Sequence, residues 1–349
     1  MLQFLILSFL IFTFKFSLAN DLVNEPKPLL KNEIHRGVCW VGERQMLPNY
    51  SIPKAKEFGV EWLSITPFGW MQNHKTPEVH SGGYLWGETD EGLIVTTREA
   101  HKNGVKVLLK PHLWITQPLE NGWRGEINFE TEAEWKKWEN SYKKFILHFA
   151  EIAEEEGIEI LCIGTEFTNP VKVRPQYWRN LIKRIREIYS GKLTYAANWY
   201  DEYEKVVFWD DLDFIGIQAY FPLSEKNNPS IQELNEGWQP HKKSVQEIAE
   251  KFGKKVLFTE IGYKSLKGTA IEPWVWPEQL NNLTANDLDF SEQENAYESL
   301  FQTFGQEDWF GGFYIWKWYP SHNSISSSNI GFTPQNKPAE KLLKKWYTK

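Results

Sequence analysis

Two glutamates stand at the ends of apolar segments that are far apart in the chain. Glu166 closes the run IEILCIGTE, and Glu260 closes the run KVLFTE. If the two ends meet at one opening, one carboxylate could attack an anomeric carbon while the other protonates the leaving oxygen, which is the chemistry of glycosidic bond cleavage. The alternative is that both are solvated strand-end charges, paired with Lys110 or Arg174.

Aromatic and polar residues stand at the ends of further apolar runs. Flat apolar rings with a polar edge match the C–H faces of a pyranose, while amide, imidazole and ammonium groups meet its hydroxyls. His112 fits a hydrogen-bonding pocket wall as well as a direct sugar contact. The candidate sugar contacts at these ends are Trp40, Lys110, His112, Trp114, Asn198, Trp199 and Trp316.

Tryptophan is frequent, with 18 copies in 349 residues. Several copies fit a helix or the core, which is the ordinary place for so large a ring. Ten instead fall at strand ends or in long loops, at positions 40, 70, 86, 114, 123, 199, 274, 276, 316 and 318. Because loops run over the surface, burial in a core explains these poorly. Trp86 and Trp123 fit lids or plugs as well as platforms for a ligand.

The elements that must position these residues show as eight short apolar runs. Their apolarity is continuous rather than alternating, which predicts strands buried on both faces, as in a parallel sheet. The runs are 36–41, 61–66, 106–110, 158–165, 192–199, 213–220, 255–260 and 311–318.

Helical periods lie between most of these runs. Apolar residues recur at spacings of three and four from Trp135 to Ile152, and Thr131 with Glu134 predicts a capping box ahead of them. A similar pattern runs from Val245 to Phe252, and Ser291 with Glu294 predicts the cap of another helix. Five glycines each follow a helical stretch and precede a strand, which predicts left-handed helix ends. They are Gly59, Gly104, Gly157, Gly191 and Gly253.

The connections on the other side of the strands are long. They cover about 67–92, 111–131, 221–240 and 261–291. Short turns on one face and long loops on the other are typical of a (β/α)8 barrel, whose active site lies on the C-terminal face of the strands. We therefore expect an α/β fold with a single (β/α)8 TIM barrel, whose long βα loops form a substrate cleft, over residues 20–349.

The first 19 residues predict a targeting segment. Residues 2–14 are almost wholly apolar, and Ser17-Leu18-Ala19 offers a small-x-small cleavage site before Asn20. This pattern is typical of a secretory signal peptide and predicts a secreted, periplasmic or extracellular protein. Lys15 lies on the wrong side of the apolar run, so an uncleaved membrane anchor remains an alternative.

Composition excludes several classes of protein. With 41% hydrophobic and 24% charged residues the chain is globular, and its net charge of −7 argues against a nucleic-acid or anionic-membrane partner. No HExxH, paired-cysteine, GxSxG or P-loop pattern occurs, so we expect no metal and no cofactor. No obligate protein partner is evident from the sequence. Cys39 and Cys162 fit two buried free thiols better than a disulfide.

Four motifs give the chain a family resemblance. They are KPHLW at 110–114, ILCIGTEF at 160–167, AANW at 196–199 and LFTEIGY at 257–263. A barrel with glutamates closing strands four and seven resembles clan A of the retaining glycoside hydrolases. With these motifs, the chain looks most like glycoside hydrolase family 113, the β-mannanases, over roughly residues 34–345.

The resemblance implies roles for four residues. Glu166 matches the acid/base and Glu260 the nucleophile. Tyr220 matches the tyrosine that orients the nucleophile, and Trp316 matches the stacking platform under the sugar whose bond is cut. No metal or organic cofactor is implied.

The sequence departs from the clan at two positions. Thr165 stands where most of the clan has an asparagine that holds the sugar 2-hydroxyl, and the frequent arginine after strand two is missing. We keep Thr165 as a candidate sugar contact. Asn198, His112 and Lys110 are then the candidates for holding the 2-hydroxyl and the nucleophile.

The implied activity is retaining hydrolysis of β-1,4-mannosidic bonds in mannan or manno-oligosaccharides. Two alternatives remain open from the sequence. One is a clan A hydrolase of another β-glycan, such as glucan or xylan. The other is a secreted sugar-binding barrel without turnover.

Overall fold

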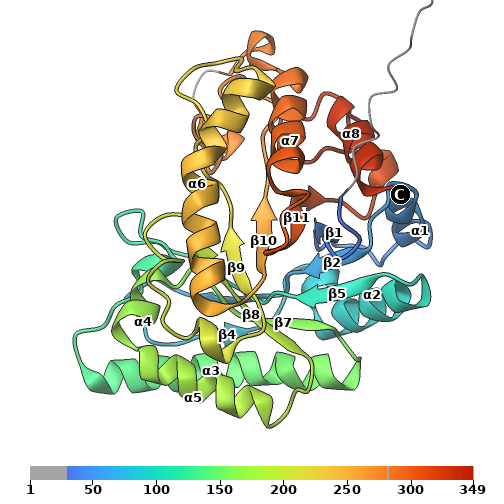
Figure 1. Ribbon diagram of the computed structural model, residues 1–349. Helices are drawn as coiled ribbons and strands as arrows, with labels where there is room; N and C mark the ends of the chain where they lie inside the picture. Colours follow the sequence, from blue (N-terminus) through green and yellow to red (C-terminus); the bar gives the residue numbers. More distant parts are fainter. Residues whose placement is uncertain (1–29, 281–282, 349) are drawn as a thin grey trace, which may run out of the picture.

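Eight parallel strands close into a barrel in a computed structural model that describes residues 30–280 and 283–348 (Figure 1). The strand order around the barrel is β1-β11-β10-β9-β8-β7-β5-β2. All eight predicted strands and the (β/α)8 fold are confirmed. The strands are β1 (His35–Trp40), β2 (Trp62–Ile65), β5 (Lys106–Leu109), β7 (Ile160–Thr165), β8 (Lys192–Asn198), β9 (Ile215–Gln218), β10 (Val256–Ile261) and β11 (Phe310–Trp318).

Helices surround the barrel. The last helix, α8, lies beside the first, α1, and the chain ends there (Figure 1). The Tyr347 hydroxyl of α8 donates to the Gly37 carbonyl of β1 at 3.1 Å, which ties the end of the ring to its beginning. The helices are α1 (Ser51–Glu57), α2 (Asp90–Lys102), α3 (Glu132–Glu155), α4 (Thr168–Val173), α5 (Pro175–Arg186), α6 (Ile231–Phe252), α7 (Phe290–Phe304) and α8 (Pro338–Tyr347).

The strands are buried on both faces, as their continuous apolarity predicts. One face packs against the helices in the large core, and the other fills the barrel interior. Cys39 and Cys162 belong to the interior cluster and are free thiols, as predicted. Burial raises the pKa of the Cys162 thiol to about 11, so this sulfur stays protonated and acts as a small apolar side chain.

The predicted helix starts are confirmed at α3 and wrong at α7. At α3, the Thr131 hydroxyl accepts from the Glu134 N–H at 3.3 Å, and the Glu134 carboxylate accepts from the Thr131 N–H at 3.0 Å. At α7, the cap is Asp289, whose carboxylate accepts from the Glu292 N–H at 2.9 Å. Ser291 lies inside the helix, which begins at Phe290 directly after the Asp289 cap.

Four of the five predicted left-handed glycines have positive φ angles, and Gly191 does not. At Gly191 a side chain is excluded by lack of space rather than by the backbone angle. A Cβ there would lie 2.2 Å from the hydroxyl of buried Tyr189, which donates to the Ile158 carbonyl at 2.7 Å. The four confirmed positions are Gly59, Gly104, Gly157 and Gly253.

A second, three-stranded sheet stands above the barrel rim, where the sequence predicted only loops. It consists of β3 (Phe68–Met71), β4 (His80–Ser81) and β6 (His112–Ile115), in the order β4-β3-β6. Pro67 separates β2 from β3, and Pro111 separates β5 from β6. Proline has no N–H to donate, so each barrel strand ends there and its chain continues into the second sheet.

The predicted signal segment, residues 1–19, lies outside the described residues, so export stays a prediction. Within the described residues, no helix is both long enough and apolar enough to cross a membrane.

Two glycine-to-alanine variants test how tightly α8 closes the ring. Gly59, after α1, has a φ of +80°, and a Cβ there would lie 2.7 Å from the backbone carbonyl carbon of Tyr347. Gly104, after α2, has a φ of +67°, but a Cβ would meet nothing nearer than the Lys56 Nζ at 3.8 Å. We expect Gly104→Ala to lose about 1–2 kcal/mol through backbone strain alone, and Gly59→Ala to lose clearly more because α8 must shift. Equal losses in urea unfolding experiments would contradict this.

Candidate active site

A cavity of about 1070 Å³ opens at the C-terminal ends of the barrel strands. Both predicted glutamates, from the ends of β7 and β10, line this one cavity. Its other walls come mainly from the long βα loops. The lining residues are Phe68, His112, Trp114, Trp123, Arg124, Glu166, Asn198, Trp199, Tyr200, Tyr220, Glu260, Trp274, Trp276, Glu278, Gln279, Trp316 and Phe332.

Glu260 is held by a fully buried cation. The Lys110 ammonium donates to Glu260 Oε1 at 2.5 Å, to the Thr259 carbonyl at 3.0 Å and to Gln218 Oε1 at 3.3 Å. The Tyr220 hydroxyl donates to the other oxygen, Oε2, at 3.0 Å. Each carboxylate oxygen of Glu260 therefore has a hydrogen-bond donor.

His112 is a neutral ring beside this pair. Burial is the main cause that holds its pKa well below the usual range, and the cations of Lys110 and Arg124 add to it. Its Nε2 lies 3.4 Å from Glu260 Oε1 but makes no hydrogen bond with it. A neutral imidazole forms no ion pair, so we interpret this approach as a packing contact. The unpartnered nitrogen of a cavity-lining ring can then bond a ligand hydroxyl.

Glu166 has the opposite environment. Burial raises the pKa of its carboxyl, and the charge of Glu260 adds to this, against the lowering effect of Arg124. Asn198 Nδ2 donates to Glu166 Oε1 at 3.0 Å, and the Arg124 guanidinium contacts Oε2. A carboxyl with a raised pKa beside a second carboxyl that is paired with a lysine is the arrangement that separates a general acid from a nucleophile.

A third buried carboxyl, Glu202, lies behind Glu166. It accepts from the Asn198 N–H and the Thr168 hydroxyl, both at 2.9 Å, and from the Tyr195 hydroxyl. The Tyr195 oxygen in turn accepts from the N–H of Phe167, the residue after Glu166, at 2.7 Å. Glu202 thus holds both the segment that carries Glu166 and the asparagine that touches it.

Three residues predicted to contact sugar do not line the cavity, and their roles are corrected. Lys110 is fully buried behind Glu260 and contacts that carboxylate. Trp40 is 3% exposed and packs in the outer core, because its neighbour Cys39 points into the barrel. Thr165 is 1% exposed, and its hydroxyl has no partner among the described residues.

The other predicted residues do line the cavity: His112, Trp114, Asn198, Trp199, Tyr220 and Trp316. Of the loop tryptophans, Trp123, Trp274 and Trp276 join them, and Trp274 stacks on Trp199 with ring centroids 5.1 Å apart. Trp70 and Trp86 lie outside the lining. Trp316 meets Trp276 edge to face at 6.2 Å, so indoles form much of the wall.

Sequence reasoning missed Arg124 and Glu202. Arg124 begins a 3₁₀ turn, Arg124–Glu126, inside a long loop without any distinguishing pattern. Glu202 lies two residues before exposed Glu204 in an acidic stretch, and no local signal tells the buried carboxyl from the solvated one.

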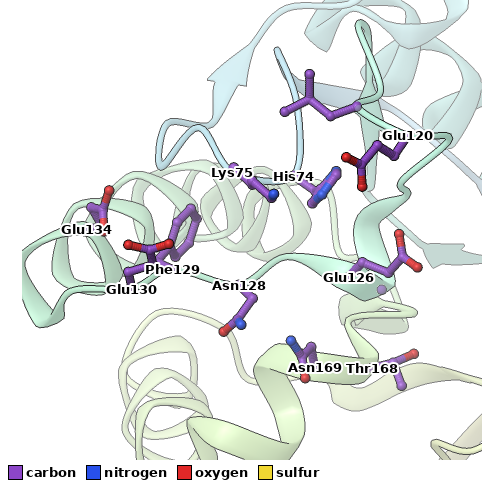
Figure 2. Close-up of a pocket in the computed structure, with 12 residues that line it drawn as sticks. His74, Lys75, Glu120, Glu126, Asn128, Phe129, Glu130, Glu134, Thr168 and Asn169 are labelled. Carbon is purple, nitrogen blue, oxygen red and sulfur yellow. The ribbon is translucent and has the colours of Figure 1, made fainter.

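A second cavity, of about 780 Å³, lies across that 3₁₀ turn (Figure 2). Gly125 and Glu126 line it, whereas Arg124 lines the first cavity. Its wall is mixed, with four glutamates, Glu120, Glu126, Glu130 and Glu134, beside a lysine, a histidine and apolar residues. None of the predicted site residues lines it, so the first cavity is the candidate active site.

The comparisons with known proteins agree on one family. The sequence model of Glycoside Hydrolase Family 113 matches residues 44–347. A structure of a GH113 β-1,4-mannanase in a complex is 25% identical, with a TM-score of 0.76, over 90% of this chain and 99% of that one. A GH113 β-mannanase from Alicyclobacillus acidocaldarius, in complex with ManMIm, is 27% identical, with a TM-score of 0.75, over 91% and 98%.

A more distant match shows the fold alone. A β-glucuronidase from Ruminococcus gnavus is 10% identical with a TM-score of 0.57, over 89% of this chain and 49% of that one. No curated protein matches the chain.

The burial of Glu202 predicts a pH-dependent contribution to stability. Burial raises its pKa from the ordinary 4.5 to about 7. Between these values the folded protein keeps a proton that the unfolded chain releases, so the contribution is complete below pH 4.5 and is lost as the pH rises through 7. Each unit by which the pKa differs between the folded and the unfolded chain contributes about 1.4 kcal/mol to the free energy of unfolding. Unfolding free energies at pH 5 and 8 should therefore differ less in Glu202→Gln than in the wild type.

The matched control for this measurement is Glu204→Gln, which changes an exposed carboxyl in the same segment. It should keep the pH dependence of the wild type. A Glu202→Gln profile that runs parallel to the wild type would show that Glu202 does not titrate in this range.

Proposed function

Because this chain belongs to glycoside hydrolase family 113, we propose that it hydrolyses β-1,4-mannosidic bonds by a retaining, two-glutamate mechanism. The observation that carries the proposal is the contrast between two buried carboxyls in one cavity. Glu260 is paired with Lys110 and Tyr220, whereas burial raises the pKa of Glu166. Mannan or manno-oligosaccharide is the proposed substrate because the similar structures are described as β-mannanases.

In the first step, a carboxylate oxygen of Glu260 attacks the anomeric carbon as the bond to the leaving oxygen breaks. Glu166 gives its proton to that oxygen, and a glycosyl ester on Glu260 results. The raised pKa of Glu166 supports this role, because a general acid must hold its proton before reaction. Asn198, which donates to Glu166 Oε1, keeps the carboxyl oriented.

In the second step, Glu166 is ionised and takes a proton from water, which attacks the anomeric carbon and releases Glu260. The change of role follows from electrostatics. Esterification removes the charge of Glu260, and that charge is one of the causes that raise the pKa of Glu166. A retaining enzyme also needs the two carboxyl groups about 5–5.5 Å apart, and two inversions leave the product in the β configuration.

The sugar bound next to Glu260 would meet both apolar and polar groups. Trp316 lines the cavity and supplies an indole face for the sugar C–H groups. His112 Nε2 and Trp316 Nε1 are buried without hydrogen-bond partners among the described residues. They are the proposed contacts for ligand hydroxyls, since buried polar groups in a binding site are satisfied when the ligand arrives.

Replacing the nucleophile tests the mechanism. Glu260→Ala should reduce the release of reducing sugar from β-mannan by at least about 10⁴-fold, because removing a residue that acts covalently removes the main reaction path. Added azide should restore turnover and give the α-mannosyl azide, since it attacks from the side that the carboxylate occupied. Glu260→Gln, which retains the side-chain volume, controls for folding. Substantial residual turnover without azide would refute the assignment of Glu260.

A panel of polysaccharides tests the substrate. Chromatography of the products from β-mannan, β-glucan and xylan should show the fastest release from mannan. Faster release from glucan or xylan would keep the mechanism and overturn the proposed glycan.

Replacing the buried cation tests how Glu260 is held. Lys110→Met retains most of the side-chain volume but leaves the buried Glu260 carboxylate without its counter-charge. Removing one partner of a buried ion pair lowers the free energy of unfolding by about 3–5 kcal/mol. We expect kcat on mannan to fall at least 100-fold with a much smaller change in KM, because Lys110 touches the nucleophile and not the sugar. Lys106→Met, at the exposed start of β5, the strand that precedes Lys110, should retain wild-type kinetics. Retained kcat in Lys110→Met would contradict the role.

A further inference from the structure

The small sheet above the barrel presents a row of side chains that continues outward from the candidate active site. In the parallel pair of β3 and β6, Phe68 lies opposite His112, and Trp70 lies opposite Trp114. Side chains two positions apart on a strand point to the same face. These four side chains therefore share one face of the sheet.

The first row of this face belongs to the cavity. Phe68 and His112 line it, and the His112 ring approaches Glu260. In the second row, Trp114 still lines the cavity, while Trp70 stands beyond it. Successive same-face residues on a strand are about 7 Å apart, so the second row lies that far along the strands from the first.

The second row is exposed, although its residues are large and apolar. Trp114 is 58% exposed and Trp70 is 38% exposed. The opposite face of the sheet is buried, with Met71 at 0% and Leu113 at 1% exposure. A Cβ at Gly69 would lie 2.6 Å from the Phe145 ring of α3, so the sheet is seated closely on that helix.

Trp70 is held in one orientation by its other neighbour. The His80 ring of β4 stacks on it, with centroids 4.2 Å apart and planes 21° apart. Since β4 and β6 pair with opposite edges of β3, His80 covers the side of the indole away from Trp114. The other face of the Trp70 indole is not covered by His80 and is directed toward Trp114. Beyond the row, the exposed amides of Gln72 and Gln117 bond each other at 3.1 Å.

We propose that Trp70 and Trp114 form an outer binding platform for pyranose units of the β-linked glycan chain, remote from the bond that is cut. The inference rests on the proposed function, because the occupant is the continuation of the chain held in the cavity. Flat, exposed indoles match the C–H faces of sugar rings, and the neighbouring amides can exchange their mutual bond for sugar hydroxyls. The platform makes long chains better substrates than short ones.

The test compares substrates of increasing length. In Trp70→Ala, we expect kcat/KM on the shortest manno-oligosaccharide that is cleaved to stay within about twofold of the wild type. On longer oligosaccharides and on mannan it should fall about tenfold, mainly through KM, because remote contacts contribute uniform binding. Trp70→Phe should recover part of the loss, since it restores a flat ring.

Two control variants separate the platform from a structural role. Trp70→Leu keeps apolar volume without a ring face, so it should show the same dependence on chain length as Trp70→Ala. Tyr50→Ala removes an exposed ring outside both the sheet and the cavity lining and should change nothing. An unchanged profile in Trp70→Ala, or an equal loss at every chain length, would overturn the proposal.

Failure of the proposed function gives a different result. If the wild type cleaves glucan or xylan rather than mannan, the same length series is run on that glycan, and the platform is judged by the same dependence on chain length. If the wild type cleaves none of them, retardation by each soluble polysaccharide in affinity electrophoresis replaces kinetics. Retardation lost in Trp70→Ala then supports the platform, and no difference between the two proteins overturns it.

Discussion

The ion pair between Lys110 and Glu260 is the constraint on which the arrangement of the site depends. Both side chains are almost completely removed from water, and neither charge would be tolerated there alone. Lys110 follows β5 and Glu260 belongs to β10, and these strands are four places apart in a ring of eight, on opposite sides of the barrel. The ammonium also binds the carbonyl of Thr259 and the amide of Gln218. The pair therefore joins opposite sides of the closed barrel, so the orientation of Glu260 depends on barrel closure.

Two other buried carboxyls at the site, Glu166 and Glu202, have different surroundings and different roles. Glu166 has no lysine of its own, and burial raises the pKa of its carboxyl despite the Arg124 guanidinium. Glu202 does not line the cavity, but its three accepted hydrogen bonds join the segment after Glu166 to Asn198. Glu166 has a φ of +52°, a backbone conformation that is strained for a residue with a side chain. Such strain persists only where the surroundings fix it, and the contacts of Glu202 provide that fixation.

The strands, most helix ends and the positions of the two glutamates could be predicted because each is encoded locally. Apolar runs, helix caps and glycines each determine the structure of only a few neighbouring residues, so a short stretch of sequence is enough to recognise them. The face of the strand on which Trp40 lies could not be predicted. A strand that is apolar on both faces does not show which side chains point into the barrel and which point toward the helices. Lys110 is a candidate for holding either the sugar 2-hydroxyl or the nucleophile, and the sequence could not decide between these, because its partner Glu260 lies 150 residues away. Arg124 and Glu202 could not be found for a similar reason, since contacts across the barrel mouth make them distinctive and their neighbours in sequence do not.

The small sheet is a further feature of the cleft that depends on contacts between segments distant in sequence. Pairing between β3 and β6 joins two segments that the sequence presents as separate loops, so neither segment shows it alone. Once Pro67 and Pro111 end the barrel strands, the two emerging chains are already parallel neighbours, because β2 and β5 pair in the barrel below. Their pairing is therefore a consequence of barrel register. A wall built in this way is ordered before any ligand binds, so less conformational entropy is lost on binding than for a loop that must fold around its ligand. The aromatic rows of the small sheet are thus fixed by a hydrogen-bond ladder that follows from the pairing of β2 and β5 in the barrel.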